Sequence, residues 1–394
     1  MTTSAKAKLM RRLNHSAVLD VVREHSPISP TGIGDCLKLT LPTVIRMLKE
    51  LEGEGLIRQT GLTQASGGRP RVLVEFNPSN SAVIGVDLSG AKMYGAIADL
   101  GGAIQEEIGY PYGQETGPHL IERLEEMIEH LLQAPRPAGQ TIRGIGIGAP
   151  GLTDPDQGIV TLAVSLGWRN VPLRDILQKR FNLPVMVEND VNLEALGEYG
   201  FGVGKGVSSL VCISIGTGIG AGVMIDRKIY HGFHKSAGEI GYLLPGIDYL
   251  RQIYPGFGAL ESVASGTSAA ARLRAISAEQ GQPDDDITAD TVFTAARMCQ
   301  PWAVEVLNDT INYLTIAVSS VSTILDPEVI VLGGSMAVSS GINFIDPIKE
   351  RLQGVIPVLP TIVQTQLGYR ASVMGAIMSV LDATTDHLAI NRLA

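Results

Sequence analysis

Carboxylate groups closely follow two apolar segments that predict buried strands. Asp87 comes after residues 82–86, and Asn189 and Asp190 come shortly after residues 183–187. A carboxylate in such a place can take a proton, or accept a hydrogen bond, from a hydroxyl group of a bound molecule. These positions therefore predict a polar binding site at the ends of the strands.

Glycine-rich turns follow two further apolar segments. Gly216-Thr217-Gly218 comes after residues 210–215, and Gly333-Gly334 comes after residues 329–332. Backbone N–H groups in such turns can approach a phosphate closely, because no Cβ intervenes. A structural interpretation is also open: a tight hairpin at the first turn and a strand-to-helix connection in a buried sheet at the second.

From residue 81 onward, apolar strand segments alternate with helices, which is typical of an open α/β fold. Polar groups in such folds gather at the carboxyl ends of the strands, where sites usually lie. The two strand-and-turn units at Asp87 and at Gly216 indicate a duplicated domain with a cleft between its halves.

The first 78 residues predict a separate unit of three short helices and a hairpin. We expect the helices over residues 14–25, 31–38 and 41–52, and the strands over residues 56–58 and 71–76. In the third helix, Val44, Leu48 and Leu51 recur at helical spacing and must face a core. This order of elements is typical of a winged helix-turn-helix.

The third helix would enter the major groove of DNA. It would present Thr43 and Arg46 to base edges, with Lys49 nearer the phosphates. Arg69 and Arg71, in and beside the loop between the strands, could reach phosphates or a minor groove. The alternatives are a helix-turn-helix used for protein contact and a helical cap.

The charge distribution supports DNA binding by this first unit. Residues 1–78 carry 4 Lys and 7 Arg against 2 Asp and 5 Glu, a net charge of +4, whereas the whole chain has a net charge of −9. The remaining residues therefore carry −13. A basic head on an acidic body indicates that only the head meets a polyanion.

Length and composition restrict the class of protein. The 394 residues are enough for two or three domains, and 45% are hydrophobic. Cys36, Cys212 and Cys299 are scattered and odd in number, which favours a reducing compartment, so we expect a cytoplasmic protein without disulfides. No uncharged apolar run reaches membrane-spanning length, and we expect neither a membrane partner nor a signal peptide.

Six motifs stand in the order of the ROK family (repressors, open reading frames and kinases), which the chain resembles over nearly its whole length. They lie at residues 67–70 (Gly-Gly-Arg-Pro), 148–151 (Gly-Ala-Pro-Gly), 166–170 (Leu-Gly-Trp-Arg-Asn), 188–192 (Glu-Asn-Asp-Val-Asn), 216–220 (Gly-Thr-Gly-Ile-Gly) and 236–241 (Ser-Ala-Gly-Glu-Ile-Gly). The repressor branch is the most similar. It joins a winged helix to a sugar-kinase-like body.

The resemblance implies an α/β fold with an N-terminal winged helix-turn-helix and a duplicated, actin-like (ribonuclease H-like) two-lobe body. The expected boundaries are residues 1–78 for the DNA-binding domain, 79–193 for the small lobe and 194–374 for the large lobe. A C-terminal helix over about residues 375–394 is expected to pack back on the small lobe.

The resemblance also implies which residues bind a sugar. Asp190 matches the base that takes the hydroxyl proton in the kinases of the family, and Asn189, Glu239 and Glu261 match further sugar-contacting positions. The alternative for each is a helix cap or a surface charge. The family usually has asparagine at Ser165 and histidine at Tyr242, and these two departures would reshape the pocket around a different ligand.

The nucleotide site departs from the family at its first turn. Kinase members read Asp-x-Gly-Gly-Thr at this turn. Here Asp87 and Gly90 match the pattern, but Ser89 replaces the first glycine and Ala91 replaces the threonine. The turns at Gly216, Thr217 and Gly218 and at Gly333 and Gly334 match further nucleotide positions. A Cβ near the phosphate and a lost hydroxyl predict that phosphotransfer has been lost and that the chain is not an enzyme.

The zinc site of the family has no equivalent ligands here. Residues 254–261 contain no cysteine, and Tyr242 replaces the histidine, so we expect no structural zinc and no cofactor. His231 and His234 could ligate a metal, but no third ligand accompanies them.

These observations predict a transcriptional regulator, most simply a repressor. Its expected partners are operator DNA and a sugar or sugar-like effector, and paired half-sites predict a homodimer or homotetramer. The alternatives are an active ATP-dependent sugar kinase that also binds DNA, and a regulator whose body binds a partner protein.

Overall fold

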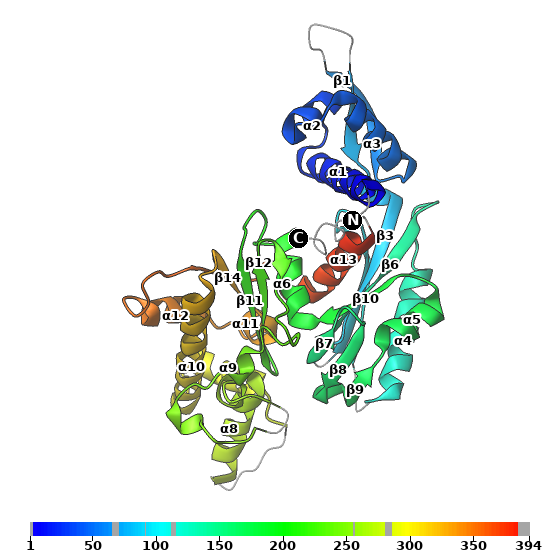
Figure 1. The fold of residues 1–394 in the computed structure, drawn as a ribbon. Helices are drawn as coiled ribbons and strands as arrows, with labels where there is room; N and C mark the ends of the chain where they lie inside the picture. The colour runs from blue at the N-terminus through cyan, green and yellow to red at the C-terminus, as the bar shows by residue number, and fades with distance from the viewer. Residues whose placement is uncertain are drawn as a thin grey trace.

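The computed structural model describes residues 3–64, 71–90, 92–111, 116–254, 257–279 and 286–384. A small N-terminal head stands above a body of two lobes, and each lobe is built on its own five-stranded sheet (Figure 1). Within these ranges, none of the helices combines the length and the apolar character that a bilayer crossing requires.

The head contains three helices and a two-stranded antiparallel sheet. The elements are α1 (Thr3–His25), α2 (Pro30–Leu37), α3 (Leu41–Gly53), β1 (Ile57–Gln64) and β2 (Arg71–Phe76). Val44, Leu48 and Leu51 of α3 are buried as predicted, because the 3.6-residue period places them on one face. The winged helix-turn-helix order of elements is therefore present.

Two elements of the head are longer than predicted. Helix α1 begins at Thr3 rather than at residue 14, and Arg11 in the added turns pairs with Glu50 of α3 at 2.7 Å (Nη2 to Oε1). The apolar periodicity gave no sign of this polar extension. Strand β1 continues past residue 58 to Gln64, because it pairs antiparallel with β2 from Ile57↔Phe76 to Gln64↔Arg71.

The first lobe has a mixed five-stranded sheet in the order β10-β6-β3-β4-β5. Its elements are β3 (Ser81–Asp87), β4 (Lys92–Asp99), β5 (Ile104–Pro111), α4 (Pro118–Gln133), β6 (Thr141–Ala149), α5 (Leu173–Phe181) and β10 (Val185–Asn189). The small sheet of β7 (Leu152–Asp154), β8 (Ile159–Ala163) and β9 (Trp168–Val171) is inserted after β6. Strands β3, β4 and β5 are antiparallel, whereas β6 and β10 run parallel to β3.

The second lobe repeats this sheet in the order β13-β12-β11-β14-β15. Its strands are β11 (Leu210–Ile215), β12 (Ile219–Ile225), β13 (Lys228–Ile229), β14 (Val329–Gly333) and β15 (Thr361–Gln364), and its helices are α7 (Glu261–Ala264), α8 (Gly266–Glu279), α9 (Ala289–Arg297), α10 (Pro301–Leu325), α11 (Gly334–Ser339) and α12 (Ile345–Leu352). Three antiparallel strands again precede two parallel ones. The repeat confirms the predicted duplicated body.

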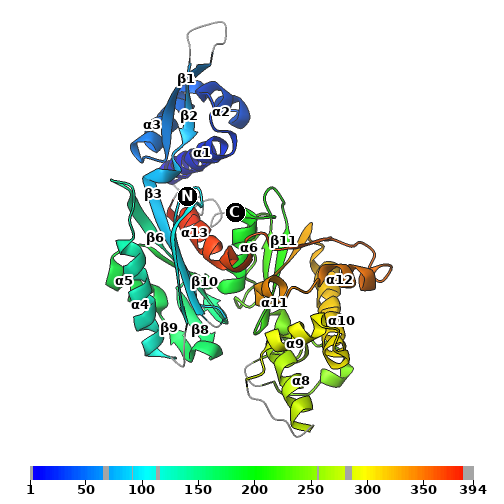
Figure 2. The ribbon, with the colours of Figure 1, turned by 180° about the vertical axis from the view of Figure 1, so that it is seen from behind.

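Two helices cross between the sheets and join the lobes. Helix α6 (Asp190–Phe201) and helix α13 (Ala371–Thr384) lie side by side in the centre of the body in both views (Figures 1 and 2). A Cβ on Gly375 would overlap the backbone carbonyl of Leu193, so only glycine allows this close approach. Helix α13 follows the last strand of the second lobe but packs against β3 and β6 of the first.

Candidate functional site

Asn189 forms the cap of α6 and holds the side chain that follows it. Its Oδ1 accepts hydrogen bonds from the N–H groups of Val191 and Asn192, both at 3.0 Å. Its Nδ2 donates to the carbonyl oxygen of Gly151 and to Oδ1 of Asp190, also at 3.0 Å. The cap therefore fixes the Asp190 carboxyl in the first turn of the helix.

Asp190 is buried at the point where the two lobes meet. Only 8% of the residue is exposed. Burial raises the pKa of its carboxyl well above the usual value, and the negative charges of Asp87 and Glu194 raise it further. A carboxyl in this environment gains strongly from a hydroxyl partner, because it has lost most of its water.

Asp87 ends β3, but its own neighbours already satisfy both of its oxygens. Oδ1 accepts the N–H of Ser89 at 3.1 Å and the hydroxyl of Ser372 at 3.0 Å, and Oδ2 accepts the Ser89 hydroxyl at 2.7 Å. Burial raises the pKa of Asp87, and these hydrogen bonds oppose the shift. Gly90 then turns the chain with a φ of 69°, while Ala91 lies outside the described residues.

Glu239, Tyr242 and Glu261 belong to the second lobe and interact electrostatically with one another. Burial raises the pKa of Glu261, and the charge of Glu239 adds to this shift. The pKa of Glu239 is also raised by burial, and its charge acts in turn on Asp190. Tyr242 lies in the short 3-10 helix Ile240–Tyr242 and is 59% exposed. Carboxyls of both lobes thus share one electrostatic environment.

The turn at Gly216–Gly218 connects β11 to β12 and is held by the start of α8. The N–H of Gly216 donates to the carbonyl of Gly218 at 2.9 Å, and the carbonyl of Gly216 accepts the N–H of Gly266 at 2.8 Å. The Thr267 hydroxyl donates to the carbonyl of Thr217 at 2.7 Å. The carbonyl groups of Gly216, Thr217 and Gly218 thus all accept hydrogen bonds within the protein, which fits the interpretation of this turn as a tight hairpin.

The second glycine pair lies at the junction of β14 and α11. Gly334 has a φ of 80°, and a Cβ there would meet the backbone of Ile215. A Cβ on Gly333 would lie 2.9 Å from Oε2 of Glu194. Close packing therefore accounts for both glycines as a strand-to-helix connection.

Ser165 stands apart from the other predicted ligand residues. It lies in the short 3-10 helix Val164–Leu166 between β8 and β9, where it is exposed. Among the contacts of the described chain, none joins it to Asp190 or Glu239.

Helix α3 presents the predicted DNA-reading side chains at the surface of the head. Arg46 and Lys49 are exposed, whereas Thr43 is half-buried and its hydroxyl lies 2.9 Å from that of Thr40. Arg69 lies outside the described residues. Arg71 is placed in β2, but its side chain is not described.

A zinc ion does not fit the residues at the family's usual position. Tyr242 and the residues from Tyr254 to Glu261 supply no thiolate or imidazole. Throughout the described ranges, no group of three or more His, Cys, Asp or Glu side chains is placed to hold a metal.

The model of the ROK family matches residues 83–383 of the chain, which is most of its length. The chain belongs to the ROK family. The predicted resemblance to the ROK family is thereby confirmed.

Relatives of both branches of the ROK family are similar to this chain. It is 31% identical over 396 residues to the xylose repressor of Caldicellulosiruptor bescii, covering 95% of this chain and 96% of the relative. A solved ROK family transcriptional regulator, a homologue of the E. coli MLC protein, gives a TM-score of 0.81 at 25% identity over 98% of this chain and 99% of the other. The Streptomyces griseus ROK glucokinase, solved with glucose and AMPPNP, gives a TM-score of 0.66 at 27% identity. This match covers 75% of this chain and 98% of the glucokinase. The predicted fold class is confirmed.

Two features of this ROK protein were missed from sequence. Burial raises the pKa of Glu194, which receives the Ser214 hydroxyl at 2.8 Å, to about 8. Its place one helical turn after Asp190 was the available signal. Residue His231, weighed earlier as a metal ligand, instead lies 2.7 Å from Glu188 of the first lobe. Nothing in the local sequence pairs these two residues.

Proposed function

We propose that this ROK protein is a sugar-responsive transcriptional repressor. The head binds operator DNA through α3, and the body binds the effector beside Asp190. One observation carries the proposal: the same chain combines a DNA-reading head and a ligand-binding body. Arg46 and Lys49 are exposed on a helix-turn-helix, and the kinase-like body buries the carboxyl of Asp190, which can bind a ligand hydroxyl. The xylose repressor of C. bescii supports it, because the similarity spans head and body alike.

The effector in this proposal is a monosaccharide, with D-xylose as the first candidate. Asp190, Glu239 and Glu261 are acceptors that suit a ligand rich in hydroxyl donors. In this proposal Asn189 orients Asp190. The exposed ring of Tyr242 offers an aromatic face to the ligand at the edge of the binding site. In this proposal Ser165, exposed on the first lobe, offers its hydroxyl to the ligand.

The proposal includes loss of phosphotransfer. Ser89 binds the carboxylate of Asp87 through both its N–H and its hydroxyl, so it competes with a metal or a phosphate-bound water for this group. The nucleotide positions Gly90, Gly216, Thr217, Gly218, Gly333 and Gly334 then serve as turns.

A sugar kinase is the second candidate. Asp190 keeps the position of a general base, and the body is similar to that of the S. griseus glucokinase. In this case ATP and a sugar would be converted steadily to products.

The architecture proposed for this function has three units in a cytoplasmic protein. Residues 1–78 bind DNA, and residues 79–193 and 194–374 form the lobes, with the C-terminal helix returning to the first. The protein acts as a homodimer or homotetramer, because paired heads read two half-sites about one helical turn of DNA apart.

One set of measurements tests the proposal. Operator sequences are first selected from a random DNA pool, and binding is followed by fluorescence anisotropy with and without a panel of pentoses and hexoses. We expect tight binding to selected DNA and a sugar-dependent change in affinity. A coupled ATP assay on the same panel distinguishes the kinase. Failure to select any DNA, or steady ATP turnover with a sugar, would overturn the proposal.

A further inference from the structure

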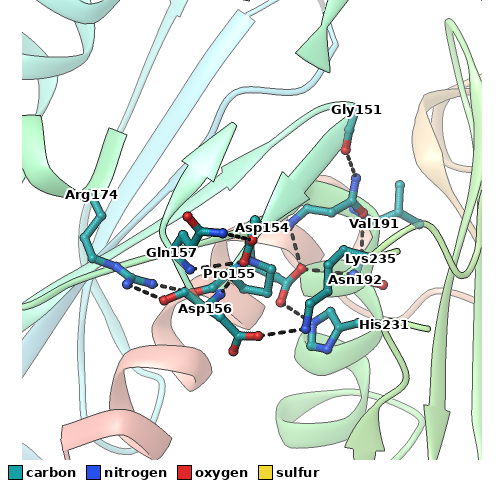
Figure 3. Close-up of polar contacts among 12 residues, drawn as sticks. Gly151, Asp154, Pro155, Asp156, Gln157, Arg174, Val191, Asn192, His231 and Lys235 are labelled. Atoms are coloured by element: carbon teal, nitrogen blue, oxygen red, sulfur yellow. Dashed lines mark hydrogen bonds and ion pairs between the residues drawn. The ribbon is translucent and has the colours of Figure 1, made fainter. Parts of the chain in front are cut away.

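Two ion pairs connect the lobes through a single loop. The loop covers residues 230–238 of the second lobe, between β13 and the 3-10 helix that begins at Ile240. Nε2 of His231 lies 2.7 Å from Oε2 of Glu188. Nζ of Lys235 lies 2.7 Å from Oδ2 of Asp156, and both of these residues are labelled in Figure 3. Both acceptors belong to the first lobe.

Glu188 links His231 to the helix that carries the effector residues. Its Oε1 accepts the N–H of Asn189 at 2.8 Å and the Nδ2 group of Asn192 at 3.0 Å. The other oxygen, Oε2, is hydrogen-bonded to Nε2 of His231. One carboxylate therefore connects the second lobe to the cap of α6, which holds Asp190. The Glu188 side chain is only 12% exposed, so water competes weakly for these bonds.

Asp156 is held in a turn that is itself firmly bonded to the first lobe. The guanidinium of Arg174 donates to the carbonyl of Asp156 at 2.8 Å and to the carbonyl of Pro155. Oδ1 of Asp154 accepts the N–H groups of Asp156 and Gln157 at 3.0 and 3.1 Å. The Lys235 pair thus has a fixed anchor, although the pair itself is exposed and contributes little alone.

The loop also leads directly to Glu239, a proposed effector-binding residue of the second lobe. Glu239 follows Lys235 by four residues. The N–H of Ala237 donates to the carbonyl of His231 at 3.1 Å, and the N–H of Ala221 in β12 donates to the carbonyl of Gly238 at 2.7 Å. A movement of His231 relative to Glu188 would therefore move Glu239 relative to Asp190.

We propose that residues 230–238 form a cross-lobe latch, and that His231 is a positioning residue which holds the effector-binding groups of the two lobes in register. The latch engages Glu188 and Asp156 in the closed body and releases them when the lobes separate. Its effect on effector affinity rests on the proposed function, whereas its effect on closure does not.

The latch strengthens when His231 is protonated. Burial lowers the pKa of His231, but the hydrogen bond and the charge of Glu188 outweigh burial and raise the pKa above its usual value. The other charged groups that face the ring are Lys235, which lowers the pKa, and Asp156, which raises it. Because the pKa is raised in the closed state, the stabilisation is complete below about pH 6.5 and is lost as pH rises through the higher value.

The first experiment needs no effector. Small-angle X-ray scattering compares ligand-free wild type, His231→Gln and His231→Arg at about pH 6 and about pH 9. His234→Gln is the matched control, because the His234 ring packs against Phe233 on the same loop. We expect His231→Gln to be expanded at both pH values, wild type to expand only at the higher pH, and His231→Arg, which keeps its charge, to stay compact. Equal scattering from all four proteins would overturn the latch.

The second experiment measures D-xylose affinity by calorimetry on the same four proteins. At about pH 6 we expect His231→Gln to bind several-fold more weakly, because glutamine cannot form the ion pair with Glu188. His234→Gln should match wild type, and His231→Arg should retain affinity with a flat pH profile. An equal affinity of His231→Gln and His234→Gln would show that His231 does not position the effector-binding groups. If wild type binds no sugar, the proposed effector fails, while the scattering result still decides the latch.

Discussion

The hydroxyl of Ser89 donates a 2.7 Å hydrogen bond to Oδ2 of Asp87, while the Ser89 N–H binds Oδ1 of the same carboxylate. Ser89 thus contacts both oxygens of the carboxylate that ends β3. The substitution does more than add a Cβ to a turn, because it supplies a local partner that competes with any ligand of Asp87.

Freeing Asp87 should strengthen nucleotide binding. The double variant Ser89→Gly with Ala91→Thr reinstates the turn of kinase members, and we expect it to bind Mg-ATP more tightly than wild type. Titration calorimetry measures this. Ser89→Ala, which removes only the hydroxyl, should give a smaller gain. Unchanged binding in both variants would show that Ser89 does not control the site.

Arg46 should read a base, because it is exposed on the face of α3 opposite the buried Val44 and Leu48. We expect Arg46→Ala to weaken specific DNA binding by about 1–3 kcal/mol and to affect random DNA much less. Lys49→Ala serves as the comparison and should weaken both about equally. Anisotropy titrations on selected and random duplexes check this, and an equal loss for Arg46→Ala would make it a phosphate contact.

Asp190 should be required for the effector response but not for DNA binding. The isosteric variant Asp190→Asn keeps the volume of the side chain and removes an acceptor of ligand hydroxyl protons. We therefore expect operator affinity as in wild type and no change on adding sugar. The measurement is anisotropy across a sugar titration, with Asp175→Asn on α5 as a control outside the site. A normal sugar response in Asp190→Asn would exclude this carboxyl from the site.

Glu194 should make the fold less stable in alkali. Its pKa is about 8 in the folded protein against the usual 4.5, so the folded state binds the proton more tightly. The stabilisation is complete below about pH 4.5 and is lost as pH rises through about 8. Relative to wild type, Glu194→Gln should therefore gain in Tm between about pH 5 and pH 9. Calorimetry measures this gain, and exposed Glu305→Gln should show none.

Gly375 should be intolerant of any side chain. Because a Cβ would overlap the Leu193 carbonyl where α13 crosses α6, we expect Gly375→Ala to lower the free energy of unfolding by about 1–3 kcal/mol. The control is Gly53→Ala at the end of α3, where a Cβ meets nothing within 4 Å and helix propensity favours alanine. Urea unfolding compares the two, and equal stability would contradict the close approach.

The strands that bear site residues were predictable because their signals are local. Segments 82–86 and 210–215 are apolar runs followed by polar or glycine turns, and they form β3 and β11. The short or half-exposed strands β5 and β13 carry weaker patterns and were not predicted. The extension of α1 to Thr3 was missed for a similar reason, since its polar residues have no apolar period.

By itself the sequence determined the winged head, the duplicated α/β body and the identity of the residues at the strand ends, because hydrophobic period and turn chemistry are written within a few residues. Only the tertiary structure decided which polar groups meet. His231 and Glu188 are 43 positions apart, and Lys235 and Asp156 are 79 apart. Such pairs form because the two sheets and the two crossing helices bring loops that are distant in the sequence together in space. A pattern within a few residues cannot predict such contacts.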